Sequence, residues 1–182
     1  MAFPVQFSGF SMNEVYMVFG DLFTKPFQIK DMTWIILPVI ATIIVMELYY
    51  AMHKDEQLGW NTATANSLVL IFVSMDLLRF LFSNKEFTFN PSNSGFSATL
   101  LVFFVLIEGI ILVTINFKHK LPEFLAFRVS SQLSINLTAY AVVVLTYARI
   151  PLTLSAIIAV IVFFVLMNIL FLVMRTFIPS KT

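Results

Sequence analysis

The sequence contains no cysteine, only five glycines and only two histidines among its 182 residues. Without cysteine, a disulfide, a thiolate metal site, an iron–sulfur cluster and a cysteine nucleophile are excluded. With so few glycines, the chain also has no Walker A loop and no dinucleotide-binding glycine fingerprint. We therefore expect neither a bound nucleotide nor a cofactor.

Charge is equally scarce. Charged residues make up 12% of the chain and hydrophobic residues 59%, whereas an average soluble domain has about 25% and roughly 45 to 50%, respectively. The formal net charge is +1, and no basic tract is present that would bind nucleic acid. The 21 phenylalanines are spread along the whole chain. This composition excludes a water-soluble globule and indicates a protein that crosses the membrane several times.

Apolar runs long enough to cross about 30 Å of hydrocarbon as a helix occur five times. They predict an all-α integral membrane protein, a bundle of about five transmembrane helices preceded by a short amphipathic N-terminal helix. We expect an N-terminal segment (1–31) and a single transmembrane domain (32–182), with spans near 33–52, 62–82, 96–117, 124–148 and 152–174.

The N-terminal segment is predicted to form an amphipathic helix over about 11–25. Ser11 and Glu14 have the spacing of a capping box, and Pro26 is expected to end the helix. No Lys or Arg precedes Lys25, so we expect no cleaved signal peptide. The helix either lies along the bilayer or over the bundle, or it offers a docking surface to a partner.

The fourth and fifth spans are separated only by residues 148–151. Pro151 suits the first turn of a new helix, so the two spans are expected to form a tight antiparallel hairpin.

Five spans place the two termini on opposite sides of the membrane, which we expect to be the cell membrane. One side carries five cationic residues, if Arg79 reaches it, and the other carries six, which favours a cytoplasmic C-terminus by the positive-inside rule. The five on the N-terminal side are Lys25, Lys30, Arg79, Lys85 and Arg149. The six on the C-terminal side are Lys54, Lys118, Lys120, Arg128, Arg175 and Lys181.

Three charged residues are predicted to lie in one membrane half, on the side of the C-terminus: Glu47, Glu108 and Arg128. Gln132 and Asn136 follow Arg128 at four-residue intervals, on one face of a continuous helix. Two interpretations stay open. The group is either an ion or proton site or a set of structural hydrogen bonds between helices.

Asp76 and Arg79 lie three residues apart inside the second span and are predicted to be neighbours on its surface. The favoured interpretation is a structural ion pair that fixes the depth and rotation of the span, because Arg79 lies close enough to the interface to reach it. A direct role in transport is the alternative.

The chain offers only weak candidates for a metal site, namely His53, His119 and Glu123. Neither histidine belongs to a compact metal-binding helical motif, so we expect no metal.

Ser130, Ser131 and Ser134 lie in the fourth span, but no His or Lys is predicted at their depth to activate a nucleophile. We therefore expect no catalytic residue.

The sequence favours a non-catalytic subunit or scaffold of a larger membrane complex, in contact with lipid and with a membrane-protein partner or a second copy of itself. The alternative is a small transporter or ion-conducting component that uses Glu47, Glu108 and Arg128. A transporter is expected to contain helices that are interrupted inside the membrane.

Overall fold

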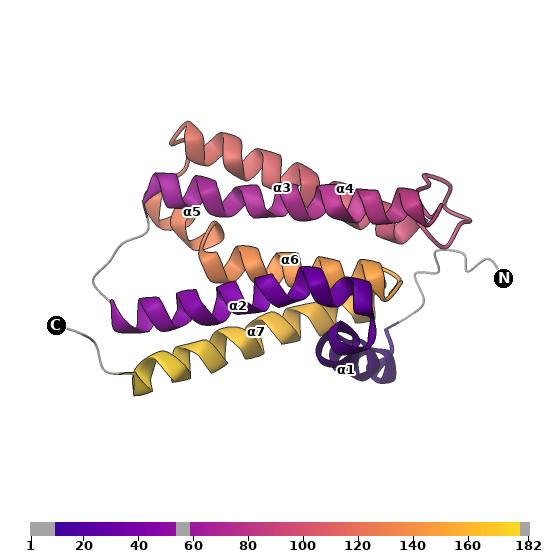
Figure 1. Cartoon of the computed structure of the whole chain (residues 1–182), viewed down its shortest axis with the longest axis horizontal. Helices are drawn as coiled ribbons and strands as arrows, with labels where there is room; N and C mark the ends of the chain where they lie inside the picture. Colours follow the sequence, from indigo (N-terminus) through magenta and orange to yellow (C-terminus); the bar gives the residue numbers. More distant parts are fainter. Residues whose placement is uncertain (1–9, 54–58, 179–182) are drawn as a thin grey trace.

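The structure is a computed structural model that describes residues 10–53 and 59–178. These two ranges contain no strand and form seven helices: α1 (Met12–Gln28), α2 (Lys30–Met52), α3 (Trp60–Ser83), α4 (Phe96–Phe117), α5 (Glu123–Val129), α6 (Gln132–Tyr147) and α7 (Leu154–Phe177). Five stretches are long and apolar enough to cross a bilayer: α2, α3, α4, α5 together with α6, and α7. The predicted all-α membrane bundle of about five spans is confirmed (Figure 1).

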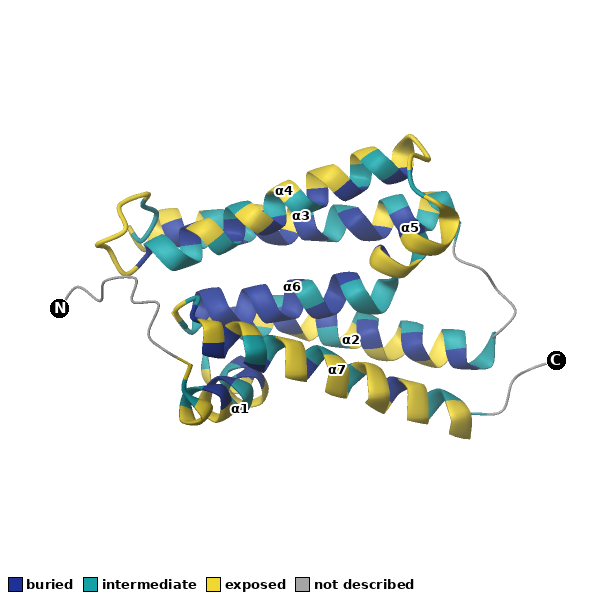
Figure 2. Ribbon diagram, turned by 180° about the vertical axis from the view of Figure 1, so that it is seen from behind, coloured by how far each residue is buried: buried dark blue, intermediate teal, exposed yellow. Residues whose placement is uncertain are grey.

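The bundle is built around α6. This helix is buried at almost every position from Ile135 to Tyr147, and it contacts α2, α3 and α4. The antiparallel pair of α3 and α4 lies on one side of α6, with α2 and α7 on the other (Figure 1). Figure 2 shows the contrast between the buried α6 and the widely exposed surface of α7.

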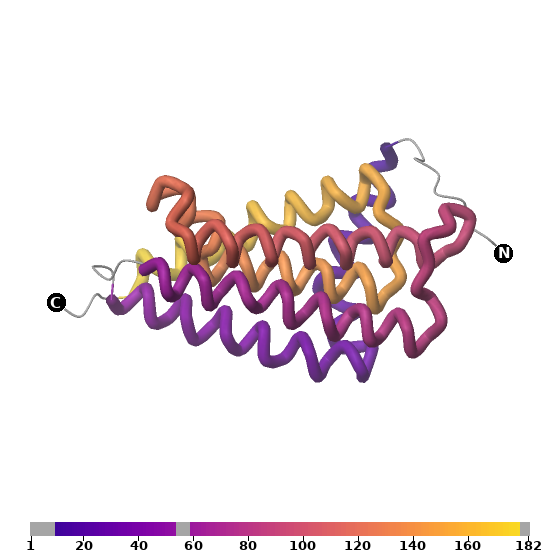
Figure 3. The backbone as a smooth tube through the Cα atoms, turned by 90° about the horizontal axis from the view of Figure 1, so that it is seen from above, coloured from indigo at the N-terminus to yellow at the C-terminus, as the bar shows by residue number. Residues whose placement is uncertain are grey.

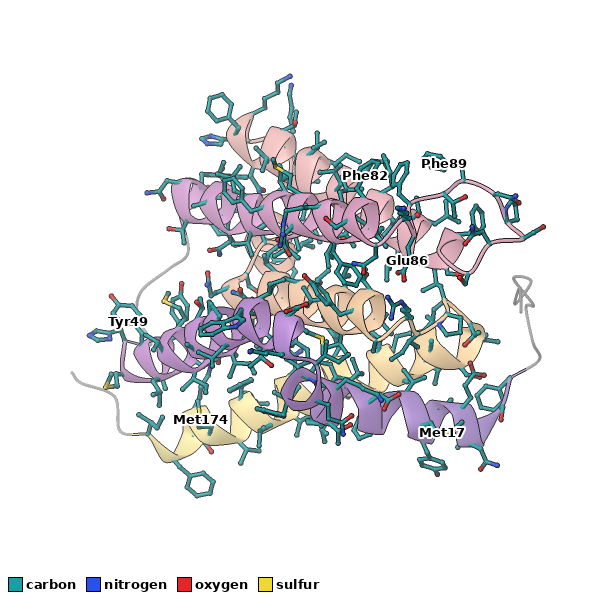
Figure 4. All side chains as sticks on the ribbon, turned by 45° about the vertical axis from the view of Figure 1, so that its right-hand side comes forward. Met17, Tyr49, Phe82, Glu86, Phe89 and Met174 are labelled. Carbon is teal, nitrogen blue, oxygen red and sulfur yellow. The ribbon has the colours of Figure 1, made fainter. Side chains whose placement is uncertain are left out.

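Helix α1 crosses one end of the bundle instead of running along it (Figure 3). Its Val15 and Val18 pack against Leu145 of α6 and against Ala156 and Ala159 of α7. Its opposite face exposes apolar side chains, of which Met17 is labelled in Figure 4. The predicted amphipathic helix thus lies over the bundle, and its outer face is free to meet the bilayer or a partner.

The predicted capping box of α1 is wrong. The Ser11 side chain makes no capping hydrogen bond, and the Glu14 carboxylate instead accepts a hydrogen bond of 2.6 Å from the Thr153 hydroxyl. The Ser11 N–H donates to the hydroxyl of Ser155. Partners at the start of α7 thus take the place of the local contacts.

Pro26 does not end α1, which continues to Gln28. Proline has no N–H to donate to the carbonyl four residues earlier, and here that carbonyl belongs to Leu22. The hydroxyl of Tyr140 on α6 donates to the Leu22 carbonyl at 2.6 Å. The helix tolerates Pro26 because a side chain from another helix replaces the missing donor.

The connection between the fourth and fifth spans also differs from the prediction. Helix α7 begins at Leu154, and Thr153 caps it by accepting from the N–H of Ala156, so Pro151 lies before the helix. The link is short, but α7 packs mainly against α1 and α2 and has little contact with α6. The expected tight hairpin is therefore wrong, because α1 packs against the adjoining ends of α6 and α7 and α2 contacts both helices.

Three helices end on residues in the left-handed conformation, although none of these residues is glycine. Lys85, His119 and Arg149 follow α3, α4 and α6 with φ of 58°, 51° and 54°. Each donates its N–H to a carbonyl of the last helical turn, as in a Schellman motif. These cationic or ionisable side chains suit helix C-termini, where the macrodipole favours positive charge.

Candidate functional site

The predicted fourth span is interrupted between α5 and α6, where one helix over 124–148 was expected. Helix α5 ends at Val129 and α6 begins at Gln132, and Ser131 adopts an extended backbone between them. Serine hydroxyls compete for backbone hydrogen bonds and favour helix starts over helix interiors. The Ser131 hydroxyl accepts from the Ser134 N–H, so it caps α6 at its first turn.

The backbone groups exposed by the interruption have partners. The Ser134 hydroxyl donates to the carbonyl of Arg128, and the Asn66 side chain donates to the carbonyl of Ser130 at 2.9 Å. An unsatisfied backbone group in lipid costs several kcal/mol. The interruption is therefore a built feature of the fold.

A buried polar network holds Ser130 in place. The Asn116 amide of α4 donates to the hydroxyls of Ser130 at 2.7 Å and Ser67 at 3.0 Å, and Ser67 donates to Ser130. Asn66, Ser67, Asn116 and Ser130 are all buried. The α3–α4 pair thus fixes one side of the interruption, which leaves the other side facing α2 and α7.

On that other side lies a cavity of about 550 Å³. It is lined by the end of α2, by α5, by the first turn of α6 and by the last turns of α7. Tyr49 on α2 and Met174 on α7 mark this end of the bundle in Figure 4. The lining residues are Glu47, Tyr50, Phe127, Arg128, Ser131, Gln132, Leu133, Ser134, Asn168, Ile169, Phe171, Leu172 and Arg175.

A bidentate ion pair forms one wall of the cavity. The Nε and Nη2 atoms of Arg175 donate to the two carboxylate oxygens of Glu47 at 2.8 and 2.9 Å. The Glu47 side chain is 2% exposed and that of Arg175 is 39% exposed. Two parallel hydrogen bonds between charged groups are the strongest geometry available to such a pair.

The structure brings together three of the five residues predicted to form an ion or proton site. Glu47, Arg128 and Gln132 line the cavity. The partner of Glu47 is Arg175, where the sequence pointed to Arg128. Because the helix is interrupted before Gln132, Arg128 does not share a continuous helical face with Gln132 and Asn136.

Asn136 and Glu108 lie outside the cavity lining. Asn136 is buried and donates to the carbonyl of Gln132. Glu108 is half-buried on α4 and forms no hydrogen bond or ion pair with any residue in 10–53 or 59–178. A role for either as an ion or proton site stays a prediction.

Asp76 and Arg79 form an ion pair at the opposite end of the bundle, with 2.6 Å between the Arg79 Nη2 and an Asp76 oxygen. The hydroxyl of Tyr147 on α6 donates to the other Asp76 oxygen at 3.3 Å. A second ion pair there joins Arg149 to Glu86, which Figure 4 labels. These contacts connect α3 and the α3–α4 loop to the end of α6.

The weak metal candidates lie apart from the cavity. The His53 ring stacks on Tyr49, the His119 ring stacks on Trp60, and Glu123 is exposed in the first turn of α5. Among the residues that the structure describes, no group of three or more potential metal-binding side chains occurs.

Sequence reasoning missed the partner of Glu47 and the cap of α6. In the sequence, Arg175 contributed only to the prediction of membrane orientation. No local pattern connects it to Glu47, which lies 128 positions away. Ser131 and Ser134 do carry a local signal, because a serine three residues before another polar residue is typical of a helix start.

The cavity lining is mixed in character. It combines an ion pair, a second arginine, and neutral hydrogen-bonding side chains from α6 and α7 with an apolar wall. No protein-family model, curated protein or solved structure matches this chain.

Proposed function

We propose that the chain is a small membrane transporter whose solute site is the cavity between α2, α5–α6 and α7. The observation that carries this proposal is the interruption of the fourth span beside a charged cavity. Non-helical backbone at membrane depth is tolerated only where it is covered by protein or lines a polar cavity. Transporters place their binding sites at such interrupted helices.

The packing supports a division into a fixed part and a movable part. Helix α6 is fixed by the core and α3–α4 by the network around Ser130. The short α5 packs mainly against α3 and α6, and the last turns of α7 are largely exposed. Because Ser130 anchors the end of α5 and Arg175 binds Glu47, solute passage then requires a movement of α7 that separates this ion pair.

Osmotic re-swelling of proteoliposomes tests this function without a known solute. Vesicles shrunk in hyperosmotic solutions of potassium salts, urea or glycerol re-swell only as fast as the solute enters. We expect at least one solute to enter faster than in protein-free vesicles, and Gln132→Trp, which fills the cavity, to abolish the difference. Ile111→Trp on the exposed surface of α4 is the matched control. Equal rates with and without protein, for every solute, would refute transport.

Glu108 offers a separate test of the predicted proton or cation site. A carboxylate inside the membrane without a charged partner is a functional hypothesis by default. In the same vesicles, we expect Glu108→Gln to leave solute entry unchanged, since Glu108 does not line the cavity. Loss of entry in this variant, with normal folding, would move the site from the cavity to α4.

A non-catalytic subunit of a larger complex is the second candidate. It is favoured by the exposed surface of α7. Only 17% of an apolar 18-residue stretch of this helix is buried, the smallest share among the five spans. Such a surface suits lipid or the helices of a partner. Purification in mild detergent separates the two cases: a stable larger assembly supports the subunit, and a monodisperse single chain contradicts it.

A further inference from the structure

The charges around the cavity do not cancel. Both carboxylate oxygens of Glu47 are occupied by Arg175, whereas the side chain of Arg128 forms no hydrogen bond or ion pair with the described residues. Within residues 10–53 and 59–178, the cavity lining therefore contains one positive charge more than negative charge. An unpaired guanidinium favours an anionic ligand.

The cavity offers unused donors from Arg128, from Arg175 and from the start of α6. The Ser131 hydroxyl donates to that of Ser134, which in turn donates to the Arg128 carbonyl, so both hydroxyl protons are already in use. Arg128 keeps all its N–H groups, Arg175 uses only Nε and Nη2 for Glu47, and the first N–H groups of a helix have no acceptor within it. Donors from α5, α6 and α7 thus surround the space from several sides.

The remaining wall is apolar. Phe127, Leu133, Ile169 and Leu172 line the cavity, and Ile169 and Leu172 continue into the exposed apolar surface of α7. A ligand with a charged group beside Arg128 and an apolar chain along α7 would satisfy both parts of the lining.

We propose that this cavity binds a phosphate group, carried by a membrane lipid or another apolar chain, with Arg128 as its principal ligand. A carboxylate presents two oxygens, which one arginine satisfies in bidentate fashion, whereas a phosphate presents oxygens toward donors on several sides. The inference rests on the proposed function only in taking the cavity as the solute site.

Isothermal titration calorimetry of the full chain in dodecyl maltoside, which carries no phosphate, tests the proposal. The probes are hexyl phosphate, inorganic phosphate, hexanoate and hexyltrimethylammonium. We expect hexyl phosphate to bind, and to bind at least about tenfold more tightly than inorganic phosphate because of its apolar chain. Equal affinity of these two supports the phosphate site and assigns it to free phosphate. Binding of neither, or equal or tighter binding of hexanoate or the ammonium probe, overturns the proposal.

Arg128→Gln is the decisive variant, because Arg128 is exposed and its side chain supports no contact among the described residues. We expect a loss of about tenfold in affinity for hexyl phosphate, the scale of one hydrogen bond to a charged group. Lys118→Gln removes a cation at the same end of the bundle, outside the cavity, and should change nothing. Unchanged binding in Arg128→Gln would refute the assignment.

The binding and flux experiments test the phosphate site and the transport function independently. Phosphate binding without solute entry removes the transport function and keeps the site. Solute entry without phosphate binding keeps transport and removes the phosphate ligand.

Discussion

Glu47 is the most constrained ionisable residue of the cavity. Its side chain is almost inaccessible, and Arg175 supplies its only hydrogen bonds among the described residues. Removal of one partner of a buried ion pair leaves an uncompensated charge, which costs more than the pair contributes when intact. The pair is therefore a point where single and double substitutions should differ.

We expect Arg175→Gln to lower the free energy of unfolding by about 3 kcal/mol, because the Glu47 carboxylate stays buried without a counter-charge. The double variant Glu47→Gln, Arg175→Gln should recover much of that loss. Thermal unfolding in detergent measures both.

The Asp76–Arg79 pair is the matched control for this prediction. The Arg79 side chain is 70% exposed, and exposed pairs contribute at most about 1 kcal/mol. Arg79→Gln should therefore have a much smaller effect. A comparable loss in both variants would contradict the assignment of the Glu47 pair as the buried, dominant one.

At the scale of the element, α1 depends on a hydrogen bond from another helix. We expect Tyr140→Phe to lower the free energy of unfolding by about 1 to 2 kcal/mol, because the buried Leu22 carbonyl loses the donor that replaces the missing N–H of Pro26. In a Pro26→Ala background the backbone supplies that donor, so the same substitution should cost less. A double-mutant cycle measures the coupling, and simple additivity would contradict this role of Tyr140.

The start of α4 requires a residue without a side chain. A Cβ at Gly95 would lie 1.9 Å from the carbonyl oxygen of Glu86, so the loop before α4 cannot close around a larger residue. We expect Gly95→Ala to lower the free energy of unfolding by about 2 kcal/mol.

Gly20 provides the internal comparison. It lies inside α1, and a Cβ there would meet nothing within 4 Å. Because alanine is the better helix former, Gly20→Ala should raise stability by about 0.5 to 1 kcal/mol. Thermal unfolding of the two variants should shift in opposite directions, and a loss in both would indicate that helix propensity is not the deciding term at Gly20.

At the scale of the whole molecule, the orientation predicted from the sequence places the cavity end of the bundle at the cytoplasmic side of the membrane. The absence of cysteine allows a direct test with single introduced cysteines. A membrane-impermeant maleimide should label Ser92→Cys, in the exposed α3–α4 loop, on intact cells. It should label Lys118→Cys only after permeabilisation. The reverse pattern would invert the molecule. Lys54 and Lys181, two of the six cationic residues assigned to the C-terminal side, lie outside the described residues.

The sequence was sufficient for the spans and insufficient for the cavity. Apolar runs of about 20 residues have one stable form in lipid, so the ends of the predicted spans differ from the observed helices only by a few residues. The interruption at Ser130 and Ser131 depends on partners from α3 and α4. Arg175 reaches Glu47 only after the bundle has formed, and such contacts between distant residues leave no periodic pattern in one sequence.

The contrast between α6 and α7 has a consequence for biosynthesis. The span formed by α5 and α6 is the least apolar of the five, and 67% of its 18-residue apolar stretch is buried. Helix α7 is the most apolar span and the least buried. A nascent α7 can partition into lipid on its own. The polar fourth span gains its favourable environment from α2, α3 and α4, which are translated before it. Membrane integration of this protein is therefore cooperative at its centre: the helix that organises the mature bundle is the one that depends most on neighbours already in the bilayer.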